Sequence, residues 1–462
     1  MKKILLYVLV MLFLTAGMAV ADDEESWITI GGDLRVRYDN LKGTVHDYIS
    51  DDGAGNVKAQ PGYDVWDNAL LLSRFGLNVK ARATQNITVK ARMLMYKVWG
   101  HETMAPVEGN YFADRATGPL DGTIGHVPSD NAMRLEQVYA TWSNFGGAPV
   151  WISAGRRPST GGVPTNLRQN LEKTGPEGIS GIMMDYAFDG AAVGYSPTID
   201  ALPGAYAKIS YGKGFDSGYV SSITVTNGQF SKPNSLKDTD YVGLNIAPFD
   251  TNNLHIDLQV QKAFHITNEP SGATSITDNV GNISWWGGVV MGKVGDLNLF
   301  ASAAQSRTDP TEHNVSGSGL LWDTNHPDAQ RSLVGTAIYV GGRYDIKSTG
   351  TKIGAEYNQG SQYWIGMVPA GDDIWTSKLG TRGKVYEVYL IQELNKKPIM
   401  KRGMAFCRVG YQYYKFDYTG SNNWMGAPEK ISDLNLTNSA NAQLLAPVQS
   451  AKDLYVTLDV LF

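Results

Sequence analysis

The sequence predicts an all-β fold, a transmembrane antiparallel β-barrel. Three features lead to this prediction: the carboxyl-terminal segment, the amino-terminal leader, and an alternation of apolar and polar side chains that recurs between them. Residues 452–462 show the alternation most clearly and end on Phe462. Successive side chains of a strand point to opposite faces, so Leu454 and Val456 share one face and Asp453 lies on the other. Such a strand suits a wall between lipid and water, although an edge strand of a soluble β-sandwich has the same pattern.

The leader has the three regions of a secretory signal peptide. Lys2 and Lys3 form the positive region, residues 4–14 the apolar region, and residues 19–21 a small-residue cleavage site. The alternative, a retained membrane helix, needs about 20 apolar residues, and this run is shorter.

We therefore expect residues 1–21 to be cleaved and residues 22–462 to form the mature barrel. The terminal Phe462 resembles the carboxyl-terminal signal that the bacterial barrel assembly machinery reads, which makes that machinery an expected partner. Together, the leader and the terminal strand predict that the protein resides in the outer membrane of a Gram-negative cell.

The composition of the 462-residue chain agrees with a barrel. After the leader, no apolar run reaches the 18 residues expected of a membrane helix, which excludes a bundle of such helices. A barrel places its apolar residues at every second position instead. The single cysteine, Cys407, excludes an internal disulfide framework. The formal net charge of −5 argues against a nucleic-acid partner.

Alternating segments recur along one domain and give about 16 strands. The count could range from 14 to 18, because residues 179–230 are ambiguous. Short turns alternate with long polar connections, which predicts short periplasmic turns, long extracellular loops and, with an even strand count, both termini in the periplasm. The predicted strands are residues 27–39, 68–83, 87–98, 132–143, 150–157, 187–197, 204–214, 238–248, 254–265, 283–294, 296–307, 335–347, 351–362, 383–393, 402–416 and 452–462.

The charged faces of the first three strands are assigned to the lumen. An Arg or Lys facing lipid at the middle of the membrane costs about 2–4 kcal/mol, so these faces turn inward. We expect a cationic stripe on one wall, set against Asp33 alone, that consists of Arg35, Arg37, Arg74, Lys80, Arg82, Lys90 and Arg92.

The later strands carry acidic residues, so we expect a more acidic wall opposite the stripe and a field across a water-filled pore that biases ion passage. These acidic residues are Asp257, Asp345, Glu356, Glu387, Asp453 and Asp459. Alternatively, the polar lining only solvates a wet lumen, and salt screens its charges beyond about 8 Å.

The third long connection, residues 158–186, is expected to fold into the barrel. General porins narrow their channel with a loop at this position, and its Gly and Pro residues allow a sharp turn. The alternative is an external loop over the barrel mouth. If the loop enters, the charged rim of a constriction would come from Arg156, Arg157, Arg168, Glu172, Lys173 and Glu177.

Two segments carry a family resemblance. They are the pair of strands at Leu72–Arg82 and Ala91–Gly100, and the Gly-Arg-Arg-Pro to Pro-Thr-Asn-Leu-Arg segment at residues 155–168. Both resemble a family of uncharacterised outer-membrane porins that is common in delta- and epsilon-proteobacteria, including metal-reducing ones. This resemblance implies an outer-membrane channel and does not specify the solute.

The leading functional hypothesis is a porin for passive diffusion of small hydrophilic solutes, leaning to anions because of the cationic stripe. A second hypothesis is a structural sleeve around a multihaem cytochrome in an electron conduit, motivated by the family's occurrence in metal reducers. A third is a specific exporter or importer of an acidic oligomer, which needs a basic ladder from mouth to mouth.

No enzyme is expected, because the chain contains no zinc-protease, nucleophile-elbow or Walker motif. It also lacks a Cys-x-x-Cys-His motif for covalent haem attachment, and no cofactor or metal site is predicted.

The lipid-facing surface predicts the remaining partners. Trp99, Trp142, Trp151 and the pair Trp285 and Trp286 lie near predicted strand ends, as expected for aromatic girdles in contact with outer-membrane lipid. A homotrimer is expected only by analogy with porins.

Overall fold

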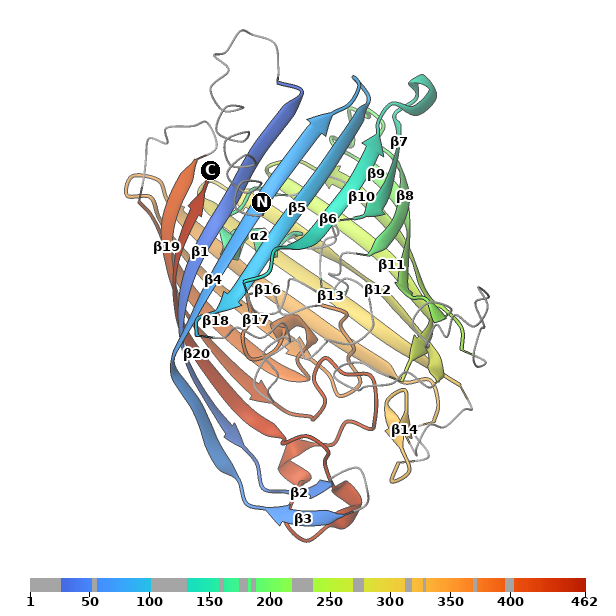
Figure 1. Cartoon of the computed structure of the whole chain (residues 1–462), viewed down its shortest axis with the longest axis vertical. Coiled ribbons are helices and arrows are strands. Elements are labelled where there is room, and N and C mark those ends of the chain that lie inside the picture. Colours follow the sequence, from blue (N-terminus) through green and yellow to red (C-terminus); the bar gives the residue numbers. More distant parts are fainter. Residues whose placement is uncertain are drawn as a thin grey trace, which may run out of the picture.

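The computed structural model describes residues 26–51, 56–100, 131–157, 162–173, 182–183, 188–217, 236–268, 278–311, 318–326, 330–368, 372–394 and 403–462. In these parts of the chain, sixteen antiparallel strands close into one barrel (Figure 1). Each barrel strand pairs with the barrel strands before and after it in the chain, and the first pairs with the last. The predicted fold class, an antiparallel β-barrel of about 16 strands, is confirmed. The predicted leader, residues 1–21, lies outside the described residues.

Each predicted strand overlaps one barrel strand. The first eight are β1 (Ile28–Val45), β4 (Tyr63–Arg82), β5 (Ile87–Val98), β6 (Arg134–Trp142), β7 (Val150–Arg156), β8 (Asp189–Tyr195), β9 (Tyr206–Phe215) and β10 (Thr239–Asp250). The second eight are β11 (Leu254–Thr267), β12 (Asn279–Val294), β13 (Leu297–Pro310), β16 (Val334–Ile346), β17 (Thr351–Gly360), β18 (Gly383–Glu393), β19 (Met404–Phe416) and β20 (Val448–Leu461).

Smaller elements lie in the connections between these strands. Two short hairpins are β2 (Tyr48–Asp51) with β3 (Val57–Gln60) and β14 (Ser318–Gly319) with β15 (Trp322–Asp323). The short helices are η1 (Phe145–Gly147), α2 (Thr165–Gln169), η3 (Lys378–Gly380), η4 (Ile431–Asp433) and η5 (Ser439–Asn441). Among the described residues, no helix has the length and apolar character needed to cross a membrane.

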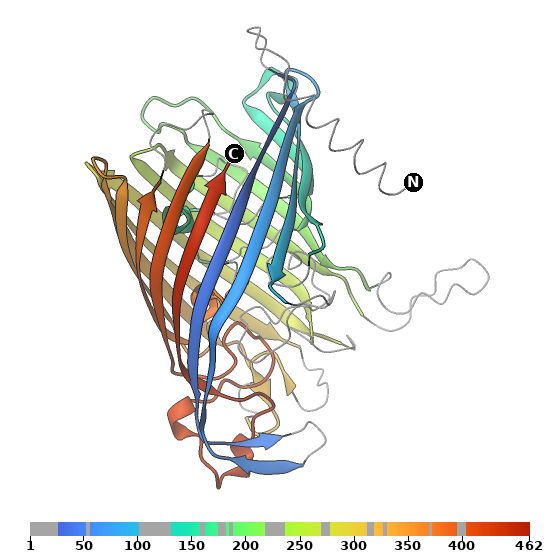
Figure 2. The same cartoon turned by 60° about the vertical axis from the view of Figure 1, so that its left-hand side comes forward.

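Strands β1 and β4 are longer than predicted. They continue to pair beyond an irregularity between Asp39 and Leu41, and with the β2–β3 hairpin they project past the other strands (Figure 2). A bulge shifts the two-residue period by one position. The bulge lies on β4, because two positions of β1 pair with three positions of β4 here, and the alternation of β4 therefore breaks. The faces of β1 keep alternating, but its inward side chain becomes apolar at Leu41 and its outward one charged at Lys42. The sequence pattern therefore underestimates the length of both strands.

The barrel closes at a seam between Gly32 on β1 and the terminal Phe462. The N–H of Gly32 donates to the carbonyl of Phe462 over 2.8 Å, and the N–H of Phe462 donates back to the carbonyl of Gly32 over 3.0 Å. A Cβ atom at residue 32 would lie 2.7 Å from the Phe462 ring, so only glycine allows this approach. The seam places β1, which carries Arg35 and Arg37, beside β20, which carries Asp453 and Asp459.

The outer face of the wall is apolar. Ile353, Leu390, Val409 and Val456 form one row across β17, β18, β19 and β20, and each is about half exposed. Toward the end of the barrel that carries the long connections, this band gives way to a row of Tyr357, Tyr386 and Tyr413, whose neighbouring ring centroids lie 5.1 and 6.4 Å apart. An apolar band bordered by aromatic side chains is the surface expected of a wall in contact with lipid.

Two tryptophans expected in the girdles lie on the inner side instead. The side chains of Trp151 and Trp285 are buried, whereas Trp142 and Trp286 are exposed on the outer face. Adjacent residues of a strand face opposite sides, so Trp285 and Trp286 cannot both contact lipid. The prediction for Trp151 and Trp285 was wrong because it considered only how near each residue lies to a strand end, and not which face of the sheet its side chain points to.

The outer face leads to a first prediction. Val388 lies in the middle of β18, and its side chain is 56% exposed on the outer face. Replacing it with arginine should lower the free energy of unfolding by about 2–4 kcal/mol in phospholipid vesicles, because the charge would lie near the middle of the bilayer. Urea-induced unfolding measures this loss.

Thr336 provides the matched control, because it is exposed on β16 only two residues from the strand end. Thr336→Arg should cost about 0–1 kcal/mol, since the charge would lie near the lipid headgroups. Equal losses for the two variants would contradict the lipid contact of β18.

Candidate functional site in the barrel interior

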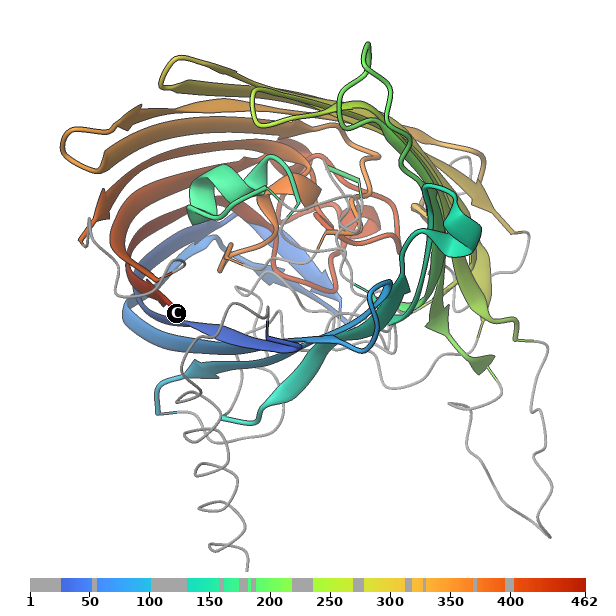
Figure 3. The ribbon, with the colours of Figure 1, turned by 90° about the horizontal axis from the view of Figure 1, so that it is seen from above.

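Two segments of the chain fold into the barrel and contact its inner wall. One is α2, in the connection between β7 and β8, and Figure 3 shows it enclosed by the ring of strands. The other is residues 372–382, which include η3 and lead into β18. Together with the wall residues that hold them, these segments form the candidate functional site.

Helix α2 is held by its carbonyl groups. The last carbonyls of a helix have no partner within the helix, so buried ones need donors from elsewhere. Two arginines of the wall supply them: Arg343 donates to the carbonyl of Leu167 (2.6 Å) and Arg408 to the carbonyl of Arg168 (2.8 Å). Lys352 donates to the side-chain Oδ1 of Asn170, directly after the helix (2.6 Å). Three wall strands, β16, β17 and β19, therefore fix one short helix.

Asp372 anchors the second segment. Its carboxylate forms ion pairs with Arg35 on β1, with Arg74 on β4 (3.2 Å) and with Arg408 on β19 (3.1 Å). Its backbone carbonyl accepts a hydrogen bond from Arg37 over 2.7 Å. One buried aspartate thus joins three wall strands that are far apart in the sequence.

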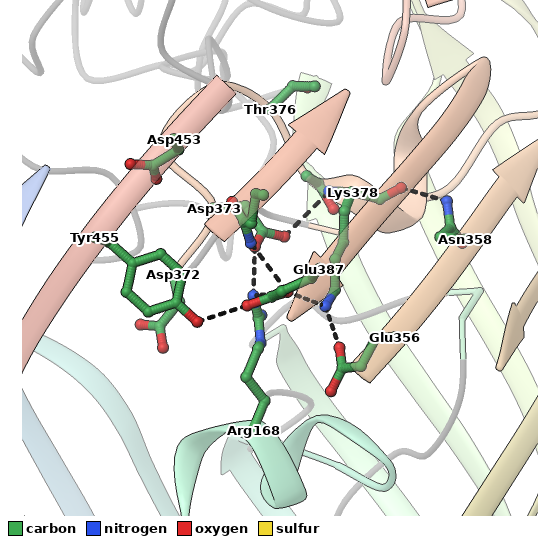
Figure 4. Close-up of polar contacts among 12 residues, drawn as sticks. Arg168, Glu356, Asn358, Asp372, Asp373, Thr376, Lys378, Glu387, Asp453 and Tyr455 are labelled. Atoms are coloured by element: carbon green, nitrogen blue, oxygen red, sulfur yellow. Dashed lines mark hydrogen bonds and ion pairs between the residues drawn. The ribbon is translucent and has the colours of Figure 1, made fainter. Parts of the chain in front are cut away.

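Lys378 and Arg168 form the second part of the site (Figure 4). Glu356 on β17 lies directly opposite Glu387 on β18, and the Nζ of Lys378 contacts both carboxylates. Arg168 contacts Asp373 (2.6 Å) and Glu387 (3.2 Å), so the two inward segments also bind each other. Two like charges directly opposite in a sheet repel one another, and the buried lysine removes that repulsion.

An apolar cluster adjoins these ion pairs inside the barrel. Trp364, Met367 and Leu379, from the connection between β17 and β18, pack with the inward-facing Trp285 and Tyr241. The indole of Trp285 donates to the carbonyl of Ile365 over 2.7 Å, and the indole of Trp364 to that of Leu379 over 2.8 Å. The N–H of Met367 donates to the carbonyl of Met183, which links this connection to the one that carries α2.

The pKa of Asp372 lies well below its ordinary value. Burial opposes ionisation of this carboxyl, but the positive charges of Arg35, Arg408 and Arg74 outweigh that effect. The carboxylate therefore stays ionised over the whole neutral and mildly acidic range.

The predicted cationic stripe divides into two parts. Arg35, Arg37, Arg74 and Arg92 form ion pairs inside the barrel. The other part lies near the short turn between β4 and β5, where Lys80 and Arg82 are exposed and Lys90 is half-buried directly opposite Lys80.

The expectation that the stripe faces only Asp33 was wrong. Its partners also include Asp372, Asp39, Glu136 and two acidic residues of β20, Asp453 and Asp459. Asp453 and Asp459 were expected on an acidic wall opposite the stripe. They lie beside it because the barrel closes between β1 and β20.

The residues expected in a constriction loop have different surroundings. Arg168 belongs to the network of buried ion pairs that joins the two inward segments to the wall, which we call the lattice. Arg157 is buried and donates to the hydroxyl of Ser153 over 3.2 Å. Arg156 pairs with Asp189 (3.4 Å), Lys173 pairs with Asp250, and Glu172 is exposed. Glu177 lies outside the described residues.

The inward segment at residues 372–382 was not predicted. The connection at residues 363–382 was expected to be one of the long outer loops, because its Gly, Asp, Ser and Pro content resembles the others. Its apolar residues, which include Trp364, Ile365, Ile374 and Trp375, were the available indication, since so many large apolar side chains need burial.

Comparison with known proteins identifies the family. Residues 64–462 match the model of a family described as protein of unknown function (DUF3373). The chain belongs to this family. A search of curated proteins gave no match.

Solved structures similar to this member of the DUF3373 family include OmpT of Vibrio cholerae. The in-vitro folded trimer form of OmpT has 12% sequence identity and a TM-score of 0.41, with 94% of this chain and 99% of the OmpT chain covered. A loop L8 deletion mutant of OmpT has 11% identity and a TM-score of 0.40, with coverages of 95% and 100%. The strand pairing of this chain by itself closes the barrel.

The anchoring role of Asp372 leads to a second prediction. Asp372→Asn should lower the free energy of unfolding by about 3–5 kcal/mol, because Arg35, Arg74 and Arg408 would lose a shared buried counter-charge. Urea-induced unfolding of the folded barrel measures the loss, and limited proteolysis should show earlier cleavage in the connection between β17 and β18.

The pH dependence tests the same aspartate. A carboxyl with a lowered pKa stabilises the folded state above its unfolded pKa, and this stabilisation is lost as the pH falls through the folded pKa. The wild type should therefore lose this contribution only below about pH 4, and Asp372→Asn should lack that acid-dependent component.

Asp433 provides the control, because its side chain is 61% exposed and pairs with Lys430 at 3.6 Å. Asp433→Asn should cost less than about 1 kcal/mol. An Asp372→Asn protein as stable as the control would contradict the anchoring role.

Proposed function

We propose that this protein is an outer-membrane channel for passive diffusion of small hydrophilic solutes, narrowed inside the barrel by its own α2 and residues 372–382. The observation that carries the proposal is the lattice of buried ion pairs that attaches both segments to the inner wall. Segments held in this way restrict the size of a passing solute. The apolar outer face suits a bilayer, and the proposed orientation places both termini in the periplasm.

A lean toward anions is the finer part of the proposal. The arginines of the stripe that are paired with acids contribute little net field, so any preference should come from exposed cations near the end with the short turns, such as Lys80. Cationic side chains exposed at a channel entrance raise the local concentration of anions.

The two other hypotheses have less support. A cytochrome sleeve needs an interior wide enough for a second protein, and here α2 and residues 372–382 take up part of the lumen. An acidic-oligomer transporter needs a continuous basic ladder, but the arginines at mid-barrel are paired with carboxylates.

The test is conductance in a planar bilayer under a KCl gradient. The purified protein should give small, stable channels with a reversal potential that favours chloride. Lys80→Gln should shift that potential toward cations without a large change in conductance. Asp372→Asn should give larger and less stable channels, because the inward segment is released.

Lys347→Gln is the control for selectivity, since this lysine is 71% exposed on a turn and pairs with Asp296. It should leave the reversal potential unchanged. A folded barrel that stays closed in both the wild type and Asp372→Asn would contradict the channel, and a very large pore without ion preference would favour the sleeve.

A further inference from the structure

Four lysines lie close together on the outer face of the wall. They are Lys384 on β18, Lys415 on β19, Lys452 on β20 and Lys42 on β1, and we refer to them as the lysine cluster. In the sheet register, Lys384 is directly opposite Lys415, and Lys452 is directly opposite Lys42. Four adjacent strands therefore each contribute one cation.

Strand alternation shows that these side chains face outward. Lys384 is two residues from Tyr386 and four from Val388, and both of these are exposed on the outer face. Lys452 likewise shares its face with Leu454 and Val456. The lysine cluster therefore belongs to the lipid-facing surface and not to the lumen.

The cluster lies at the border of the apolar band. Tyr413 is directly opposite Lys452, whose Nζ lies 6.0 Å from the centroid of its ring. On the other side, Lys42 is directly opposite Trp66, which is 66% exposed. Tyrosine and tryptophan rings favour the level of the lipid headgroups, so the four cations lie where the headgroups of the surrounding lipid would be.

Two pairs of like charges directly opposite each other are unfavourable unless a counter-ion lies between them. Inside the barrel, Lys378 performs that role for Glu356 and Glu387. On the outer face, none of the four lysines forms an ion pair with a carboxylate of the described residues. Asp64, on the neighbouring strand, lies opposite Thr44 and accepts a hydrogen bond from its hydroxyl over 2.9 Å.

We propose that the lysine cluster binds the phosphate groups of a glycolipid in the outer leaflet of the membrane. A lipid with two phosphates supplies several negative charges at headgroup depth, which complements four ammonium groups on adjacent strands. The row of Tyr357, Tyr386 and Tyr413 borders the cluster and supplies an aromatic surface for the sugar and the upper acyl chains. The inference depends on the outer-membrane location in the proposed function, but not on channel activity.

The test uses the full mature barrel in a neutral detergent, titrated with diphosphorylated lipid A and followed by native mass spectrometry. The variant carries Lys42→Gln, Lys384→Gln, Lys415→Gln and Lys452→Gln, and it should bind lipid A at least tenfold more weakly than the wild type. The control removes the same charge from four exposed lysines in other places, Lys58, Lys237, Lys347 and Lys430, and should bind within twofold of the wild type.

Two further measurements identify the ligand. Lipid A without its phosphates should bind the wild type as weakly as diphosphorylated lipid A binds the cluster variant. Inorganic phosphate in tenfold excess should not displace the lipid, and displacement would instead indicate a site for a soluble anion and overturn the proposal. Equal lipid A binding by the variant and the wild type would also overturn it.

The outcome can be separated from that of the proposed function. The cluster faces outward, so its variant should retain wild-type conductance and the heat-dependent shift in gel mobility of a folded barrel. A cluster variant with normal channels and unchanged lipid binding would contradict the lipid site alone. Absence of channels in every protein would contradict the channel alone.

Discussion

Buried counter-charges determine the shape of the barrel interior. Asp372 neutralises arginines from three strands, and Lys378 neutralises a pair of opposed glutamates. Removing charges from water is costly unless their partners are well placed, so each side of this lattice requires the other. If the inward segments left the barrel, Arg408 would lose its ion pair with Asp372, and the opposed Glu356 and Glu387 would lose Lys378. The lattice thus holds both segments inside.

The same lattice changes the role of the cationic stripe. Arg35 and Arg37 have the residue type and the face expected of a selectivity wall, but their charges are used to hold the chain together. Charges that remain exposed, such as Lys80, lie toward one end of the barrel. The proposed channel therefore separates two tasks along its axis: size restriction at the lattice and ion preference near the entrance. The outer face shows the opposite arrangement, because like charges meet there without a counter-ion among the described residues, and a lipid phosphate is proposed to supply it.

The alternation of apolar and polar side chains predicts most of the barrel and fails at a few particular residues. This alternation located all sixteen strands, because each barrel strand keeps one face toward lipid and the other toward the interior. The pattern was weaker where a bulge interrupts β4 and where an apolar side chain faces inward, as at Leu41 of β1 and at Trp285. That inward tryptophan packs on residues 364–368, and the rule of a polar lumen does not anticipate an apolar cluster inside the barrel.

The sequence by itself determined the barrel, a count of about 16 strands within a range of 14 to 18, and the residue types available on each face, because a two-residue period depends only on local backbone geometry. Only the tertiary structure decided which charges meet. Arg35 pairs with Asp459 and Asp372, which are hundreds of positions away in the chain, because closure brings β1 beside β20 and the connection before β18 turns inward. Electrostatic pairing depends on distances of a few ångströms in space, and no local pattern of residues encodes those distances.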